Sequence, residues 1–131
     1  MAIQYQVAHR SNVMTQLNTD IGASCSIKIW TGALPATCAT ADAGTNIATF
    51  TGNAGGFGTV LTGVLTASAV APTVGINGGG TAVHFRIYNG ANVILQGTCG
   101  LVASDMILTN TSIANGQTCN FTSLTVTAYG V

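Results

Sequence analysis

The sequence contains very few charged side chains. Its 131 residues include three Lys and Arg residues, three Asp residues and no Glu, so charged residues make up 5% of the chain, against about 25% in an ordinary soluble domain. Three scattered basic residues cannot neutralise a run of phosphates, which argues against nucleic acid as a partner. With so little charge, long-range steering is weak, and contacts with other molecules depend on short-range fit.

The sequence also lacks a long apolar segment. The longest uncharged stretch, residues 43–83, is interrupted by many glycines and is rich in Thr and Asn, whereas a membrane-spanning helix needs about twenty predominantly apolar residues. Residues 1–10 do not show the apolar segment behind basic residues that is typical of a signal peptide. We therefore predict no membrane association and a chain that is made and used in the cytoplasm of the producing cell.

Acidic residues are too scarce for most catalytic schemes. Only Asp20, Asp42 and Asp105 are available, and each is explained by local hydrogen bonding or solvation. A triad of His84 with Cys99 or Asp105 is formally conceivable, but no nucleophile motif surrounds any cysteine or serine. We predict that the protein is not an enzyme and uses no cofactor.

The histidines and cysteines do not show the spacing of a metal site. His9 and His84 are far apart, and no C-x-x-C pair occurs. We predict no bound metal. Cys25 and Cys119 fall on the apolar phase of predicted strands and are interpreted as small buried hydrophobic residues. Any pairing among the four cysteines is left open, because four cysteines allow three connectivities.

One short helix is predicted near the N-terminus. Ser11 or Asn12 can cap it, and Gly22 offers a left-handed stop. The apolar residues at helical spacing between these two ends are Val13, Met14, Leu17 and Ile21.

The remainder of the chain is predicted to be β. Apolar and polar residues alternate in residues 25–29 and 83–88, and further strands are expected at residues 47–51, 59–66, 92–98, 105–109 and 118–128. Asn89-Gly90 and Asn115-Gly116 indicate tight turns. A change of phase predicts a bulge near Thr122 and Ser123. The glycine-rich residues 53–58 and 75–80 are interpreted as surface loops.

This pattern predicts a single all-β domain over residues 1–131, with a β-sandwich of the jelly-roll kind favoured over a small barrel. In the strand at residues 83–88 the alternation places Val83, Phe85 and Ile87 on one face of the sheet. His84 and Arg86 lie on the other face, where we expect His84 to be exposed, or to lie at an interface, with an ordinary pKa.

Large side chains without a clear place in the core are candidate assembly contacts. Aromatic residues on an uncharged surface are typical of protein interfaces, although a second layer or the helix could equally cover Trp30 and Tyr88. Residues 1–10 alternate like a strand and could form an arm that adds to the sheet of a neighbouring subunit. The candidate contacts are Ile3, Tyr5, Val7, Trp30, Tyr88 and Tyr129.

Several segments resemble small structural proteins from the virion-gene clusters of tailed bacteriophages and prophages. They are Met-Ala-Ile-Gln-Tyr-Gln-Val-Ala at the start, residues 31–45, His84-Phe-Arg-Ile-Tyr88, Ile94-Leu-Gln-Gly97 and residues 105–111. The glycine-rich residues 53–80 depart from the group. The resemblance implies no catalytic residues to transfer, and a place in the virion after assembly in the bacterial cytoplasm.

Within that group we expect a head decoration, or cement, protein. Its partner would be the major capsid protein or another virion protein, and it would form a homo-oligomer, a dimer or trimer. A tail or neck component is the alternative within the same class. A carbohydrate-binding adhesin module is an alternative from another class, because sugars stack on exposed aromatic rings.

Overall fold

The computed structural model describes residues 3–53 and 56–130, and this part of the chain is mainly β with a single helix. The elements, in chain order, are α1 (Val7–Ile21), β1 (Ser26–Trp30), β2 (Asn46–Thr51), β3 (Gly58–Leu61), β4 (Val64–Ala67), β5 (Thr73–Val74), β6 (Gly79–Thr81), β7 (His84–Asn89), β8 (Asn92–Gly100), β9 (Met106–Leu108), β10 (Ser112–Ala114), β11 (Thr118–Cys119) and β12 (Phe121–Thr127).

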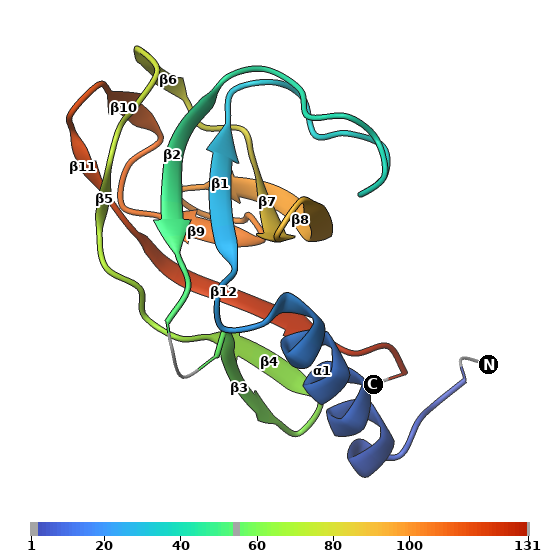
Figure 1. The fold of residues 1–131 in the computed structure, drawn as a ribbon. Coiled ribbons are helices and arrows are strands. Elements are labelled where there is room, and N and C mark those ends of the chain that lie inside the picture. The colour runs from blue at the N-terminus through green and yellow to red at the C-terminus, as the bar shows by residue number, and fades with distance from the viewer. Residues whose placement is uncertain (1–2, 54–55, 131) are drawn as a thin grey trace.

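Eight of the strands form one large mixed sheet in the order β2-β1-β7-β8-β9-β12-β4-β3. Neighbouring strands are antiparallel except for β8 and β9, which are parallel. The sheet curls, so that β12 crosses behind β1 and β2 (Figure 1). Two small ribbons, β10-β6 and β11-β5, lie beside it. The predicted all-β, sandwich-like fold with one short helix is confirmed.

The core fills the concave space of the curled sheet. Ile27 and Ile29 on β1 pair with residues of β2 and with Ile87 and Phe85 of β7, and all these side chains are buried. Phe50 of β2 meets Phe121 of β12 edge to face, with ring centroids 5.4 Å apart. Such pairs stabilise a fold by about 0.5–1.5 kcal/mol beyond the area they bury. This contact joins the two halves of the sheet.

The predictions for the core are confirmed in most positions. Cys25 and Cys119 are buried and unpaired, as is Cys99. The prediction for Val83 is wrong, because Val83 precedes β7 and is 39% exposed, and only Phe85 and Ile87 of that set enter the core.

Helix α1 begins at Val7, four residues before the predicted cap. Residues 7–10 are therefore helical, and the described part of the predicted strand-like arm, residues 3–10, contains no strand. The early start has a simple reason, since residues 3–10 include no Pro or Gly to stop a helix from extending by one turn. Gly22 ends the helix at φ +76°, as predicted. Val13 is exposed, while Met14 and Ile21 enter the core.

The predicted β7-β8 hairpin and the predicted bulge in β12 are both present, and one further turn was not predicted. The hairpin predicted at Asn89-Gly90 is confirmed, but its two turn residues are Gly90 and Ala91, because Asn89 pairs with Asn92. The register of β12 shifts between Phe121 and Ser123, as predicted. The single strand predicted at residues 59–66 is wrong. It is a hairpin of β3 and β4 that turns at Thr62 and Gly63, both with positive φ. A threonine rarely adopts that conformation, so the sequence gives little sign of the turn.

The second glycine-rich segment is partly ordered as a strand. Residues 79–81 form β6 and pair with β10, so the prediction of a loop over residues 75–80 is wrong at its end. A Cβ atom on Gly79 would lie 2.2 Å from the carbonyl oxygen of Ile113. Glycine is needed here because the two backbones approach too closely for a side chain. Of the other segment, residues 54 and 55 lie outside the described residues.

Helix α1 lies along the β3-β4 hairpin (Figure 1). The side-chain amide of Asn18 donates to the Gly58 carbonyl at 3.0 Å and accepts from the Gly58 N–H at 3.1 Å. Ser11 Oγ accepts from the N–H of Gly63 at 3.0 Å. Through Asn18 the helix therefore satisfies backbone groups of β3, the last strand of the large sheet, that would otherwise be open to another strand, and through Ser11 it bonds to the β3-β4 turn.

Candidate functional site

Polar and aromatic side chains form cross-strand rows on the face of β1, β7 and β8 that points away from the core. Alternate residues of a strand share a face, and the strand register places these side chains side by side. The rows are Trp30 with His84 and Thr98, Lys28 with Arg86 and Gln96, and Ser26 with Tyr88 and Val93.

The loop between β1 and β2, residues 31–45, covers these rows. His84, Arg86 and Tyr88 are 0%, 1% and 6% exposed. The prediction that His84 is exposed is therefore wrong. For Tyr88, the alternative that a second layer covers the ring is confirmed, and its outward placement is not. Trp30 is half-buried beside them. The reason is the loop, which covers the polar face as a second layer even though it contains no strand.

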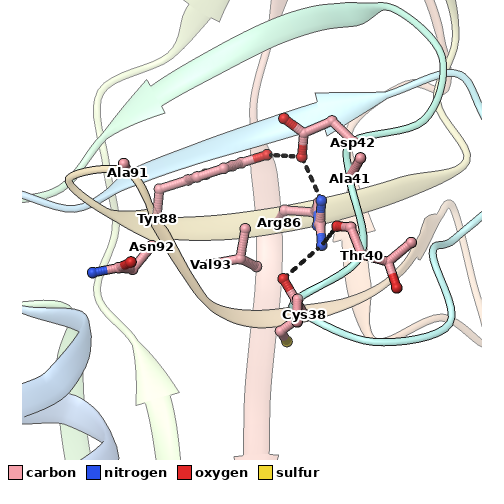
Figure 2. A pocket seen from close by; sticks show the side chains of 10 residues that line it. Cys38, Thr40, Ala41, Asp42, Arg86, Tyr88, Ala91, Asn92 and Val93 are labelled. Carbon is pink, nitrogen blue, oxygen red and sulfur yellow. Dashed lines mark hydrogen bonds and ion pairs between the residues drawn. The ribbon is translucent and has the colours of Figure 1, made fainter.

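Arg86 holds this loop against the sheet. Its Nη2 donates to the carbonyl oxygens of Cys38 at 3.0 Å and Thr40 at 2.9 Å, and its Nε donates to Gln96 Oε1 at 3.1 Å. Gln96 in turn donates to the carbonyl of Pro35 at 2.7 Å. The planar guanidinium thus gathers loop carbonyls that would otherwise be unpaired (Figure 2).

Asp42 completes this arrangement from within the loop. Its Oδ1 accepts from Arg86 Nη1 and from the hydroxyl of Tyr88. Burial acts to raise the pKa of Asp42, but the hydrogen bonds from Tyr88 and Arg86 and the charge of Arg86 outweigh it, and the pKa lies below its ordinary value. Burial, followed by the bond to Asp42 and its charge, raises the pKa of Tyr88 to about 12.

The sequence predicts the hydrogen-bonding role of two of the three aspartates but not that of the third. Asp20 accepts a bond from Gln16 one helical turn away, and Asp105 accepts from the backbone and hydroxyl of Thr98, so local bonding is confirmed for both. Asp42 is 44 residues from its partner Arg86, and the prediction of a local role for Asp42 is wrong.

His84 is enclosed beside Trp30. The two rings stack with centroids 6.4 Å apart and an interplanar angle of 8°. Nδ1 lies 2.6 Å from the carbonyl oxygen of Gly32, and because a carbonyl only accepts, Nδ1 carries the hydrogen. Nε2 is buried without a hydrogen-bond partner among the described residues. Burial, with a contribution from the charge of Arg86, lowers the pKa of His84, so the prediction of an ordinary pKa is wrong.

The conceivable triad of His84 is not assembled. Cys99 follows Thr98, the cross-strand partner of His84, and so projects from the opposite face of β8. Burial raises the pKa of the Cys99 thiol to about 12, which keeps it protonated. Asp105 is bonded to Thr98 instead.

A hollow of 540 Å³ lies between the covering loop and the β7-β8 hairpin. Cys38 to Asp42 form one wall, Ala91 to Val93 form the other, and Arg86 and Tyr88 lie between them (Figure 2). We refer to it as the loop hollow. The sequence offers one indication of the ion pair beside the hollow. The chain has only three acidic residues, so few partners are available to a buried arginine.

A second feature lies where the two ends of the chain meet (Figure 1). The N–H of Tyr5 donates to the carbonyl of Gly130 at 3.1 Å, and Tyr5 and Tyr129 line a small hollow of 160 Å³. The exposed apolar residues that line this hollow, or that lie within two residues of Tyr5 in the chain, are called the terminal patch: Ile3 (77% exposed), Tyr5 (47%), Val7 (45%), Val13 (46%) and Tyr129 (91%).

The terminal patch contains four of the six predicted contact residues, and the other two, Trp30 and Tyr88, lie under the loop. Within residues 3–53 and 56–130 no group of three His, Cys, Asp or Glu side chains is placed to hold a metal ion. In the same ranges, the structure contains no helix with the length and apolar character to cross a membrane. Comparisons with protein-family models, curated proteins and solved structures found no match to this chain.

Proposed function

We propose that the protein is a non-catalytic structural component of a tailed-phage virion, bound to the outside of the head as a decoration, or cement, protein. The observation that carries the proposal is the terminal patch: exposed aromatic and aliphatic side chains gathered where the two ends of the chain meet. Exposed apolar side chains that gather in one place on a surface are typical of protein contact sites. The resemblance of several sequence segments to phage virion proteins supplies the setting.

The low charge of the surface suits this role. Without strong fields, neighbouring copies do not repel one another, and contact is decided by shape and apolar burial. Burying one exposed side chain of the size of Ile3 stabilises a contact by about 1.5–3 kcal/mol. Repeated over a symmetric lattice, such modest contacts stabilise the assembled shell by mass action, because the decoration protein binds only the assembled shell.

The charged groups support the non-catalytic part of the proposal. Asp42 and Arg86 hold the loop that covers the sheet, Asp105 bonds Thr98, and Lys28 lies 4.6 Å from the ring centroid of Tyr88. These groups contribute to the fold itself. We further propose a symmetric dimer or trimer and the major capsid protein as partner.

The copy number of the protein in purified particles tests the proposal. A decoration protein is expected in hundreds of copies per particle, in fixed ratio to the major capsid protein, as measured by quantitative mass spectrometry against labelled peptides. A few to a few dozen copies would favour a tail or neck component instead. Absence from purified particles would overturn the proposal and favour a free adhesin.

A further inference from the structure

We propose that the loop hollow binds a neutral sugar residue. The hollow is a separate surface from the terminal patch, so this inference does not rest on the proposed role in the virion. It rests on the shape of the hollow, on one free carboxylate oxygen at its rim and on the balance of charge within it.

The shape of the hollow suits a small ligand. Its volume of 540 Å³ falls within the range of about 300–1,000 Å³ found for small-molecule sites. Its walls carry small exposed side chains, Ala39, Ala41 and Ala91, and the half-buried Val93 adds apolar surface. A pyranose ring presents C–H groups that can lie against such small apolar side chains.

Polar groups stand at the rim where hydroxyls would reach them. Asp42 Oδ1 is occupied by Arg86 and Tyr88, while Oδ2 has no protein donor in the described part of the chain, and the side chain is 38% exposed. Asn92 on the opposite wall is exposed and offers both a donor and an acceptor. A ligand with several hydroxyls can bond to both walls together.

The charges select a neutral ligand. Arg86 balances the charge of Asp42, and Lys28 is not among the residues that line the hollow, so the hollow has no net negative charge to attract a cation. Arg86 is only 1% exposed and donates to Asp42, Gln96 and loop carbonyls, so it has little capacity left for an anion. Hydroxyl groups donate and accept hydrogen bonds without carrying a charge, so they suit the polar groups that remain free at the rim of the hollow.

The site is also held ready for a ligand. The bonds from Arg86 to the carbonyls of Cys38 and Thr40 fix one wall against the sheet, and the two-residue turn at Gly90-Ala91 fixes the other. Binding then requires little further ordering of the chain, which is the main cost for sites built on mobile loops.

Titration with simple glycosides, followed by NMR of the ¹⁵N-labelled full chain, tests this proposal. The probes are the methyl α- and β-glycosides of glucose, galactose, mannose and N-acetylglucosamine, with choline and inorganic sulfate as charged comparisons. We expect at least one glycoside to give saturable shifts confined to the residues that line the hollow, 38–42, 86, 88 and 91–93. Absence of saturable shifts with every glycoside, shifts confined to other residues, or saturation by choline or sulfate alone would overturn the proposal.

Variants locate the binding on the two walls. Ala41→Trp and Ala91→Trp fill the hollow from opposite sides, and we expect each to weaken binding of the responsive glycoside at least tenfold. Asn92→Ala removes one rim group and should weaken it several-fold. Asn12→Ala, an exposed asparagine on α1, is the matched control and should bind as the parent does. Unchanged affinity in both tryptophan variants, with dispersed spectra showing that they fold, would contradict the site.

Discussion

Arg86 and Asp42 lie 44 residues apart and form the ion pair that holds the β1-β2 loop over the polar face of the sheet. Arg86 is 1% exposed, while the Asp42 side chain is 38% exposed. The arginine is therefore the buried member of the pair, and its bonds to the loop carbonyls offset the cost of taking its charge out of water.

Replacing Arg86 with methionine should destabilise the fold by about 3–5 kcal/mol, because its removal leaves the carbonyls of Cys38 and Thr40 without their donor and Asp42 with the Tyr88 hydroxyl alone. Arg86→Lys should recover only part of this loss, since an ammonium lacks the planar fork. Urea unfolding measures the change. Lys28→Met is the control, with a loss of about 0.5–1 kcal/mol from its contact with Tyr88. An Arg86→Met protein as stable as the parent would contradict the role assigned to Arg86.

Stability should fall as the pH drops below the ordinary histidine value of 6.5, because of His84. Burial lowers the folded-state pKa of His84, so above 6.5 both states are neutral. Below 6.5 the unfolded chain binds a proton that the folded chain does not, and the free energy of unfolding decreases. The lowered pKa of Asp42 acts in a separate window, since its contribution is present above its ordinary value of 3.8 and is lost as the pH falls further.

The His84 effect is measured by comparing urea midpoints at pH 7 and pH 5. The parent should lose stability between these values, and His84→Gln should lose much less, whatever its absolute stability. Equal losses in the two proteins would show that His84 does not titrate as its burial requires.

Replacing Asn18 with alanine should leave the N–H and carbonyl of Gly58 unpaired at the last strand of the sheet. We expect a loss of about 1–2 kcal/mol in the free energy of unfolding and greater self-association through the opened edge. Thermal unfolding and light scattering measure the two effects. Asn12→Ala, which changes the same residue type on the exposed side of α1, should alter neither.

Replacing the aromatic residues of the terminal patch should weaken assembly without unfolding the chain. Tyr129 is 91% exposed, so Tyr129→Ser should leave the unfolding midpoint within experimental error of the parent. Together with Tyr5→Ser it should lower binding to particles that lack the protein at least tenfold in a co-sedimentation assay. Val102→Ser, at an exposed residue between β8 and β9, is the control. If it weakens binding as much as the tyrosine variants do, the patch is not the contact.

The alternation of residues was enough to predict the core but not the covering layer. Ile27, Ile29, Phe85 and Ile87 lie inside as expected, because a two-residue period places them on one face. The same period places Arg86 on the other face without saying whether water or a loop covers it. That depends on a contact with Asp42 that is distant in sequence, and no local pattern contains it.

Helix ends and turns could likewise be predicted only where the residues at that position determine the backbone conformation. Gly22 and Gly90 act through their own backbone preferences, since both take positive φ, and the predicted helix end and hairpin are confirmed. The turn at Thr62 was missed because threonine seldom takes positive φ. The start of α1 was placed late because Val7 alternates with Tyr5 like a strand, although nothing local prevents a helix there. The exposed tyrosine at position 129 was found because it has no place in any alternating face.

The most direct test of the proposed function is the location of the protein on the particle. Gold-labelled antibody against the chain, applied to purified particles of the phage or prophage whose genome encodes it and viewed by electron microscopy, gives this location. The account predicts dense labelling over the whole head shell. Label confined to the tail or neck, or particles that bind no label, would contradict it.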